Sequence, residues 1–243
     1  MKRKVVYLSL VALMTLSLQS CFTTHNLYGA IYDIGLSSVE SPSDAKERFG
    51  ETKIVNYTDS VDKYRYEDDY IDIVWYVTKS RFNFELKNKT EHTMKINWDE
   101  VTYIDATGQA KRVIHQGVKY VDRDKAQAST TLPRGTRVSD CLIPSENIYY
   151  HNYYSQWTQH NIIPVEYSTE DKLISVAKQY EGQKLSIMMP IKIENTQNDY
   201  IFEFSLGDLK VDNKSYDVYD ETSSQLVMSL GGLLLTLLLI PLI

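Results

Sequence analysis

Apolar and polar residues alternate with a period of two through the middle of the chain. Phe82, Phe84 and Leu86 alternate with Asn83, Glu85 and Lys87, and the same alternation recurs at 94–98, 185–193 and 200–206. A period of two places neighbouring side chains on opposite faces of a sheet. Each segment is therefore predicted to be a β-strand with one buried and one solvated face.

Turn residues between these segments predict hairpins. Polar sequences separate the first pair of segments at 88–91 and the last pair at 195–199, so each pair is expected to form a hairpin. A third hairpin is predicted around Asp105-Ala106-Thr107-Gly108, because an initial Asp and a final Gly suit a type I turn. The segment Tyr70–Val77 is apolar on both faces, which is typical of a central strand.

One helix is predicted to interrupt the strands. Ser168 can cap its N-terminus, and Glu170 and Asp171 lie in the first turn, where the helix dipole favours acids. Gly182 is expected to end the helix.

These elements define a mainly β domain over residues 70–211. About seven short strands with turns between them indicate an antiparallel two-sheet immunoglobulin-like sandwich with one short helix. Residues 21–69 are expected to be a tether with room for one or two strands, and residues 212–224 are expected to be a linker.

The charge balance and the hydrophobic content each exclude one class of protein. Between Cys21 and Glu221 the chain carries 23 basic and 32 acidic residues, a net charge of −9. A nucleic-acid partner is not expected, because phosphates require a basic face. The chain is 43% hydrophobic, which is too apolar for a disordered protein.

The N-terminus, residues 1–20, has the pattern of an export signal. Lys2, Arg3 and Lys4 precede an apolar stretch, Val5–Leu18, that would reach about 21 Å as a helix, short of a membrane core of about 30 Å. The sequence Leu18-Gln19-Ser20-Cys21 that follows resembles the lipobox of bacterial lipoproteins. This resemblance implies that Cys21 is the first mature residue, with a diacylglycerol on its sulfur and an acyl chain on its new amino group. The alternative is an ordinary cleaved signal followed by an incidental cysteine.

The C-terminus carries a second predicted membrane segment. Residues 226–243 contain no charge and would reach about 27 Å as a helix, which predicts a transmembrane helix over 225–243. Asp217, Asp220 and Glu221 precede it, so this side is expected to stay outside the cytoplasm with Cys21. The alternatives are a helix buried in the soluble body and an interfacial helix. A single apolar helix favours the inner membrane with a periplasmic body, while a lipid anchor alone also allows the outer membrane.

A set of segments within about residues 70–145 carries a second resemblance, namely Phe82–Thr90, Ile96–Asp99, Asp105–Gly108 and Val113–His115. With these segments the body resembles a class of bacterial cell-envelope lipoproteins with one β-sandwich and no assigned activity. This resemblance implies the fold and no catalytic residue.

No motif in the chain predicts catalysis, a cofactor or a metal site. The histidines, His25, His92, His115, His151 and His160, lack the spacing of a helical metal site, although His151 and His160 could converge with an acid in space. The remaining cysteine, Cys141, lies in a strand-like run and is expected to be a small core residue. We therefore expect a protein that is not an enzyme.

Two clusters are candidate binding sites. Tyr64–Tyr70, with Asp59 and Asp62, could bind calcium through its carboxylates, but a solvated acidic tether fits the pattern better. The second cluster is an aromatic loop whose candidate binding residues are Tyr149, Tyr150, His151, Tyr153, Tyr154 and Trp157. Exposed aromatic rings with polar tips suit protein or sugar binding, whereas the competing interpretation packs these rings onto the domain itself.

The sequence therefore predicts a membrane-anchored envelope lipoprotein that acts as an interaction or structural module. The expected partners are the membrane and an envelope protein or glycan. The alternative is a surface lipoprotein that binds or processes carbohydrate through the aromatic loop.

Overall fold

The computed structural model describes residues 22–40, 53–58, 62–152 and 155–219. The predicted signal, Cys21 and the predicted membrane helix at 225–243 lie outside these residues. Within the described part of the chain, no helix is both long and apolar enough to cross a membrane. The chain divides into two compact units, residues 28–212 and residues 1–27 with 213–243. We call the first unit the body.

The described residues form strands β1 to β15, one α-helix and three short 3-10 helices. The strands are β1 (Phe22–Glu40), β2 (Lys53–Thr58), β3 (Asp62–Glu67), β4 (Ile71–Val77), β5 (Phe82–Asn88), β6 (Met94–Ile96), β7 (Thr102–Ile104), β8 (Ala110–His115), β9 (Thr130–Leu132), β10 (Arg137–Pro144), β11 (Ile148–His151), β12 (Gln156–Gln159), β13 (Glu166–Tyr167), β14 (Lys184–Ile193) and β15 (Thr196–Tyr219). The helices are η1 (Tyr120–Asp122), η2 (Ser145–Asn147), α3 (Glu170–Ala177) and η3 (Lys178–Tyr180). The expectation of a mainly β chain with one short helix is confirmed for these residues.

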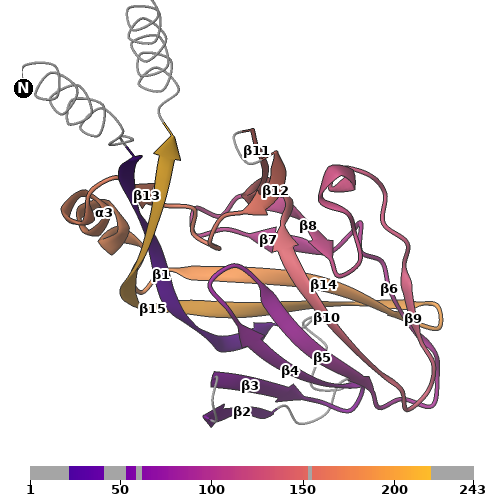
Figure 1. Ribbon diagram of the computed structural model, residues 1–243. Coiled ribbons are helices and arrows are strands. Elements are labelled where there is room, and N and C mark those ends of the chain that lie inside the picture. The colour runs from indigo at the N-terminus through magenta and orange to yellow at the C-terminus, as the bar shows by residue number, and fades with distance from the viewer. Residues whose placement is uncertain (1–21, 41–52, 59–61, 153–154, 220–243) are drawn as a thin grey trace, which may run out of the picture. The chain divides into compact units, whose positions relative to one another are not determined.

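Most strands belong to one 13-stranded sheet rather than to two separate sheets. Its order is β13-β1-β15-β14-β7-β8-β10-β5-β4-β3-β2, with β6 and β9 attached beside β14 (Figure 1). Strand β8 joins its two halves, because residues 110–112 pair with β7 and residues 113–115 pair with β10. The predicted two-sheet sandwich is therefore not formed as such, since one strand belongs to both layers.

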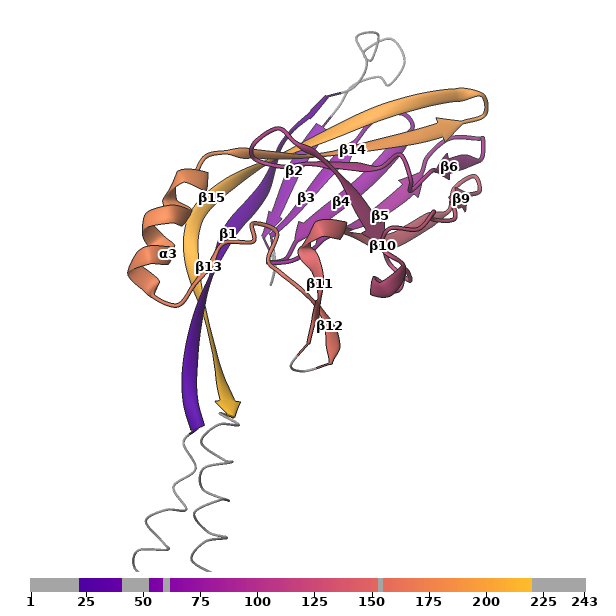
Figure 2. The same cartoon turned by 90° about the horizontal axis from the view of Figure 1, so that it is seen from above.

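The sheet curls so that its two halves face each other across an aromatic core. Five strands separate β4 and β15 in the sheet order, yet the ring centroids of Trp75 on β4 and Phe202 on β15 are 5.0 Å apart. Phe82 of β5 meets Phe204 of β15 at 5.2 Å in the same way. Figure 2 shows β14 and β15 lying across β2 to β5. The predicted alternation is confirmed here, because the inward residues of β5, β14 and β15 are buried.

Two of the three predicted hairpins are confirmed. Strands β14 and β15 pair from Lys184 opposite Ser205 to Ile193 opposite Thr196. Strands β7 and β8 pair around the predicted turn, where the Gly108 amide donates to the Asp105 carbonyl at 2.9 Å.

The predicted hairpin of 82–87 with 94–98 is wrong. Strand β5 already pairs with β4 on one edge and β10 on the other, so β6 pairs with β14 and β9 instead. The polar sequence after β5 carries the chain to the opposite layer. The Asn88 side chain fixes this crossing by donating to the carbonyls of His92 and Leu132.

The segment expected to be a tether carries three strands, β1, β2 and β3, instead of one or two. Tyr32, Leu36 and Tyr66 from this segment are buried in the core, because their rings and methyl groups extend the apolar layer. Residues 212–219 of the predicted linker belong to β15, and residues 220–224 lie outside the described residues.

Helix α3 covers one end of the core beside β13 and β1 (Figure 1). Its N-cap is Thr169 rather than Ser168. Leu173 and Ala177 are buried, and the Tyr32 hydroxyl donates to the Ala177 carbonyl at 2.7 Å.

Candidate functional site

The predicted aromatic loop forms a separate two-stranded hairpin on the body. Strands β11 and β12 pair with Tyr149 opposite Thr158 and Tyr150 opposite Trp157. The hairpin is separate from the large sheet and lies beside β8 (Figure 1). Tyr153 and Tyr154, which complete the predicted set, lie outside the described residues. The structure therefore brings Tyr149, Tyr150, His151 and Trp157 together on one element.

One face of the hairpin combines an anchor with an exposed ring. Ile148 is buried against Ile114 and Ile143, and the half-buried Trp157 packs against this small cluster. Tyr150 leans edge-on against Trp157, with ring centroids 5.5 Å apart, and remains 45% exposed. The Arg123 guanidinium lies 4.9 Å from the Trp157 ring, within cation–π range. This face presents an aromatic ring beside a cation.

The other face is turned toward His160. The Tyr149 ring stacks on the His160 ring at 4.1 Å, and Nδ1 of His160 lies 3.3 Å from the Glu166 carboxylate. His151 lies 6.3 Å from Tyr149 between ring centroids. Within the described residues, no group of three or more His, Cys, Asp or Glu side chains is arranged to hold a metal ion. His151 and His160 therefore flank Tyr149 without forming such a group.

Buried amides fix the base of the hairpin. The Asn147 side chain donates to the Asn161 carbonyl at 2.8 Å, and the Asn161 side chain donates to the Ala30 carbonyl at 2.8 Å. The Tyr120 hydroxyl donates to the Gln159 side chain at 2.8 Å. These bonds hold the hairpin in place, because a buried amide without a partner costs about 1–3 kcal/mol.

The aromatic residues thus divide between the two interpretations of the sequence. Tyr149 and Trp157 pack on the body, as the competing interpretation expects, whereas Tyr150 is available for contact. The neighbours Arg123 and Glu166 were not identified from the sequence, and nothing in the local sequence signals them. His160, which directly follows β12, was considered there only as a histidine that could converge with His151 and an acid, and the acid beside it is Glu166.

A second polar cluster lies where β8 meets β10. Nδ1 of His115 lies 3.1 Å from the Asp140 carboxylate, and the His115 ring stacks on Trp98 at 4.3 Å. Asp140 also accepts hydrogen bonds from the backbone amides of Gln116 and Cys141, both at 2.7 Å. The cluster ties β8 to β10 through one carboxylate. Its residues therefore have a structural role that accounts for every contact described.

The acidic segment Tyr64–Tyr70 is not the solvated tether that its composition indicated. Asp68 is buried, and its carboxylate accepts hydrogen bonds from the hydroxyls of Tyr66 and Tyr200 at 3.1 and 3.0 Å. The backbone amides of Tyr70 and Ile71 donate to the same carboxylate at 2.8 and 2.7 Å. Burial raises the pKa of Asp68, although these four bonds oppose the shift. Both oxygens already have protein donors, which leaves this carboxylate poorly suited to bind calcium.

Cys141 is buried, as expected of a small core residue. Burial raises the pKa of its thiol, so the reactive thiolate is disfavoured.

Comparison with family models, with curated proteins and with solved structures gave no match to this chain.

Proposed function

We propose that the chain is a membrane-anchored envelope lipoprotein whose body is a non-enzymatic interaction module. The observation that carries the proposal is the pairing of the two strands next to the predicted membrane segments. Strand β1 begins at Phe22, directly after Cys21, and β15 ends at Tyr219, shortly before residue 225. These strands are neighbours in the sheet.

Residues earlier in β1 contact residues later in β15. Within the body, Ser37 of β1 donates to the carbonyl of Glu203 at 3.1 Å, whereas Asp33 pairs with Lys210. The two strands are therefore antiparallel, so the start of β1 and the end of β15 lie at the same end of the pair. Residues 22–27 and 213–219 also belong to one compact unit.

This arrangement supports attachment of both predicted anchors to a single membrane. A lipid on Cys21 and a helix over 225–243 would both extend from this one unit, and both would enter the bilayer from the same side. A single apolar helix favours the inner membrane with the body in the periplasm. The resemblance to envelope lipoproteins and the immunoglobulin-like relationship remain part of this proposal, supported by two β layers that face each other.

The interaction surface in this proposal is the β11–β12 hairpin. Tyr150 is exposed on a hairpin whose base is fixed by buried amides, so contact orders few additional groups. Rigid aromatic side chains are favoured in interfaces because they bury a large area at low entropic cost. An envelope protein is the preferred partner. A glycan is the second candidate, because an exposed Tyr ring beside Trp157 and Arg123 also suits sugar stacking.

A photo-crosslinking amino acid at position 150 of the full chain, in intact cells, tests the surface. Tyr76 is the matched control, since it is an exposed tyrosine on β4, 37% accessible against 45% for Tyr150. We expect a crosslinked adduct from position 150 and none from position 76. An adduct whose added mass glycosidases remove supports the glycan alternative, and one whose added mass glycosidases leave in place supports a protein partner. Equal labelling at both positions, or none at either, would overturn the assignment of the hairpin.

A further inference from the structure

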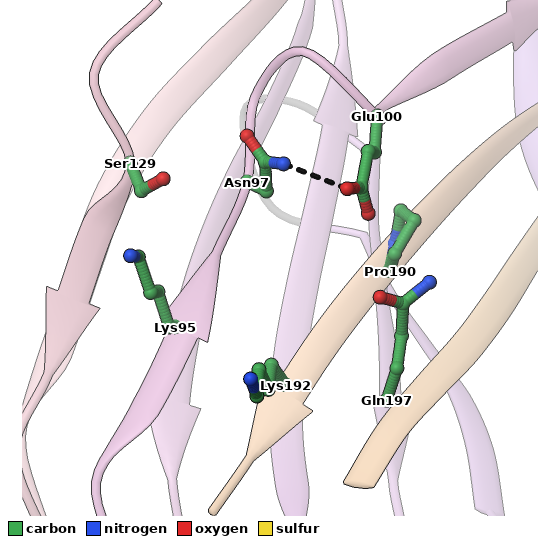
Figure 3. Close-up of a pocket in the computed structure, with 7 residues that line it drawn as sticks. All are labelled: Lys95, Asn97, Glu100, Ser129, Pro190, Lys192 and Gln197. Atoms are coloured by element: carbon green, nitrogen blue, oxygen red, sulfur yellow. Dashed lines mark hydrogen bonds between the residues drawn. The ribbon is translucent and has the colours of Figure 1, made fainter. Parts of the chain in front are cut away.

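A cavity of about 250 Å³ opens on the solvated face of strands β6, β14 and β15 (Figure 3). Its lining is polar apart from Pro190 and consists of Lys95, Asn97, Glu100, Ser129, Pro190, Lys192 and Gln197. The aromatic hairpin contributes no residue to it.

The sheet register brings two lysines together in this cavity. Lys95 of β6 is directly opposite Lys192 of β14, and Lys192 is opposite Gln197 of β15. The flanking residues Ile96 and Ile191 are buried, so the alternation of each strand directs the lysines outward. Figure 3 shows the two lysine side chains on neighbouring strands with Ser129 across from Lys95.

This lysine pair is not neutralised by the protein. Among the described residues, no carboxylate lies within 4.0 Å of the ammonium group of Lys95 or Lys192. Lys184, on the same strand, pairs with Glu203 at 2.6 Å. Like charges directly opposite each other on a sheet destabilise it. An anion bound between Lys95 and Lys192 would remove that repulsion.

The acids near the cavity accept hydrogen bonds from amides that line it and form no ion pair with the two lysines. The Glu100 carboxylate accepts a hydrogen bond from the Asn97 side chain at 2.8 Å, and Asp199 accepts one from Gln197 at 3.1 Å. Glu100 lies at the opposite end of the lining from the lysines (Figure 3). The cavity therefore has a cationic end and an end with a carboxylate and amides that can bind hydroxyl groups.

We propose that this cavity binds a sugar phosphate monoester. The phosphoryl group lies between Lys95 and Lys192, whose two positive charges match the charge of about −1.5 to −2 on a monoester at neutral pH. The hydroxyl groups of the sugar face Glu100, Asn97 and Gln197. The volume is just below the usual range of about 300–1,000 Å³, so a monosaccharide fits and a dinucleotide does not. The proposal does not depend on membrane anchorage.

Calorimetric titration of the full chain in neutral detergent at low salt tests this site. The probes are glucose 6-phosphate, inorganic phosphate and glucose. We expect glucose 6-phosphate to bind more tightly than inorganic phosphate, and glucose alone not to bind. Lys192→Gln or Lys95→Gln should lower the affinity for both phosphate probes by about tenfold or more. Lys178→Gln, an exposed lysine on η3, is the control and should leave binding unchanged.

Glu100→Gln separates the phosphate from the sugar part of the proposal. Removing this negative charge should raise the affinity for inorganic phosphate and reduce the preference for glucose 6-phosphate over inorganic phosphate. Equal affinity for the two phosphate probes in the unmodified chain would overturn the sugar assignment. Absence of phosphate binding at millimolar concentration, or an equal loss in the Lys178 variant, would overturn the site.

Discussion

Buried polar side chains fix the position of the sheet layers at the scale of single residues. Asp68 connects β3 and β4 to β15, because it accepts a hydrogen bond from the hydroxyl of Tyr200. Tyr200 lies 132 positions away along the chain. Asn88, Asn147 and Asn161 have the same role, because each donates from a buried amide to backbone carbonyls of another segment. A buried carboxylate is stable only when its oxygens have donors, which Asp68 achieves with four.

Asp68→Ala should lower the free energy of unfolding by about 3 kcal/mol, because it leaves the hydroxyls of Tyr66 and Tyr200 and two backbone amides without an acceptor. Urea denaturation of the full chain in detergent measures this difference. Asp69→Ala is the matched control, since Asp69 is the neighbouring acid and is exposed. Its expected effect is within about 0.5 kcal/mol. Equal losses for the two variants would show that Asp68 is not the anchor we describe.

The sequence could not have distinguished Asp68 from Asp69. Both lie in a run of acids and tyrosines, and composition alone favours a solvated segment. Burial of Asp68 depends on Tyr200, which no local pattern connects to it. The aromatic hairpin, in contrast, was recognisable from the density of its rings, although the division between the packed Trp157 and the exposed Tyr150 required the fold.

At the scale of elements, hairpins were predictable where a turn alone decides the pairing. Gly108 adopts a φ of +82°, which favours glycine, and it ends the turn that joins β7 to β8. The predicted β5–β6 hairpin does not form, because pairing depends on which strand edges are free. The edges of β5 are occupied by β4 and β10, and β10 lies about 50 residues further along the chain.

The β7–β8 turn should also give the body a measurable acid sensitivity. Burial by itself raises the pKa of Asp105, but hydrogen bonds from Thr107, Gln109 and Lys111 outweigh it and lower the pKa to about 2. The unfolded chain has a carboxyl pKa of about 3.9. The ionised Asp105 therefore stabilises the fold above about pH 4, and this contribution is lost as the pH falls toward 2.

Urea denaturation between pH 4.5 and 2 measures the effect. Asp105→Asn should reduce the fall in unfolding free energy over this range by about 1 kcal/mol, after solvent screening at the turn. Asp69→Asn, which removes an exposed carboxyl group outside the turn, is the control. A pH dependence that is the same in all three proteins would contradict the proposed role of the turn.

At the scale of the whole molecule, one strand decides how the layers are connected. Strand β8 pairs with β7 through its first half and with β10 through its second half, so the hydrogen bonding continues from one layer to the other. The period-two pattern predicts two buried faces but contains no information about where a strand changes partners. The core was therefore predictable, and the continuous curled sheet was not.

The predicted anchors border β1 and β15, which are antiparallel neighbours in the sheet. We expect either anchor alone to retain the protein in the membrane. One variant replaces residues 1–20 by an ordinary cleavable export signal and carries Cys21→Ala. A second ends at residue 224, and a third combines both changes. Fractionation should find the first two in the membrane and only the third released, since each attachment by itself binds the bilayer.

Metabolic fatty-acid labelling distinguishes the lipid from other causes of retention. The chain contains two cysteines, and Cys141 is buried in the body, so Cys141→Ala is the matched control. Label should disappear with Cys21→Ala and persist with Cys141→Ala. Label that persists without Cys21 would refute the lipoprotein assignment. Release of the protein by loss of residues 225–243 alone would show instead that no lipid anchors the start of β1.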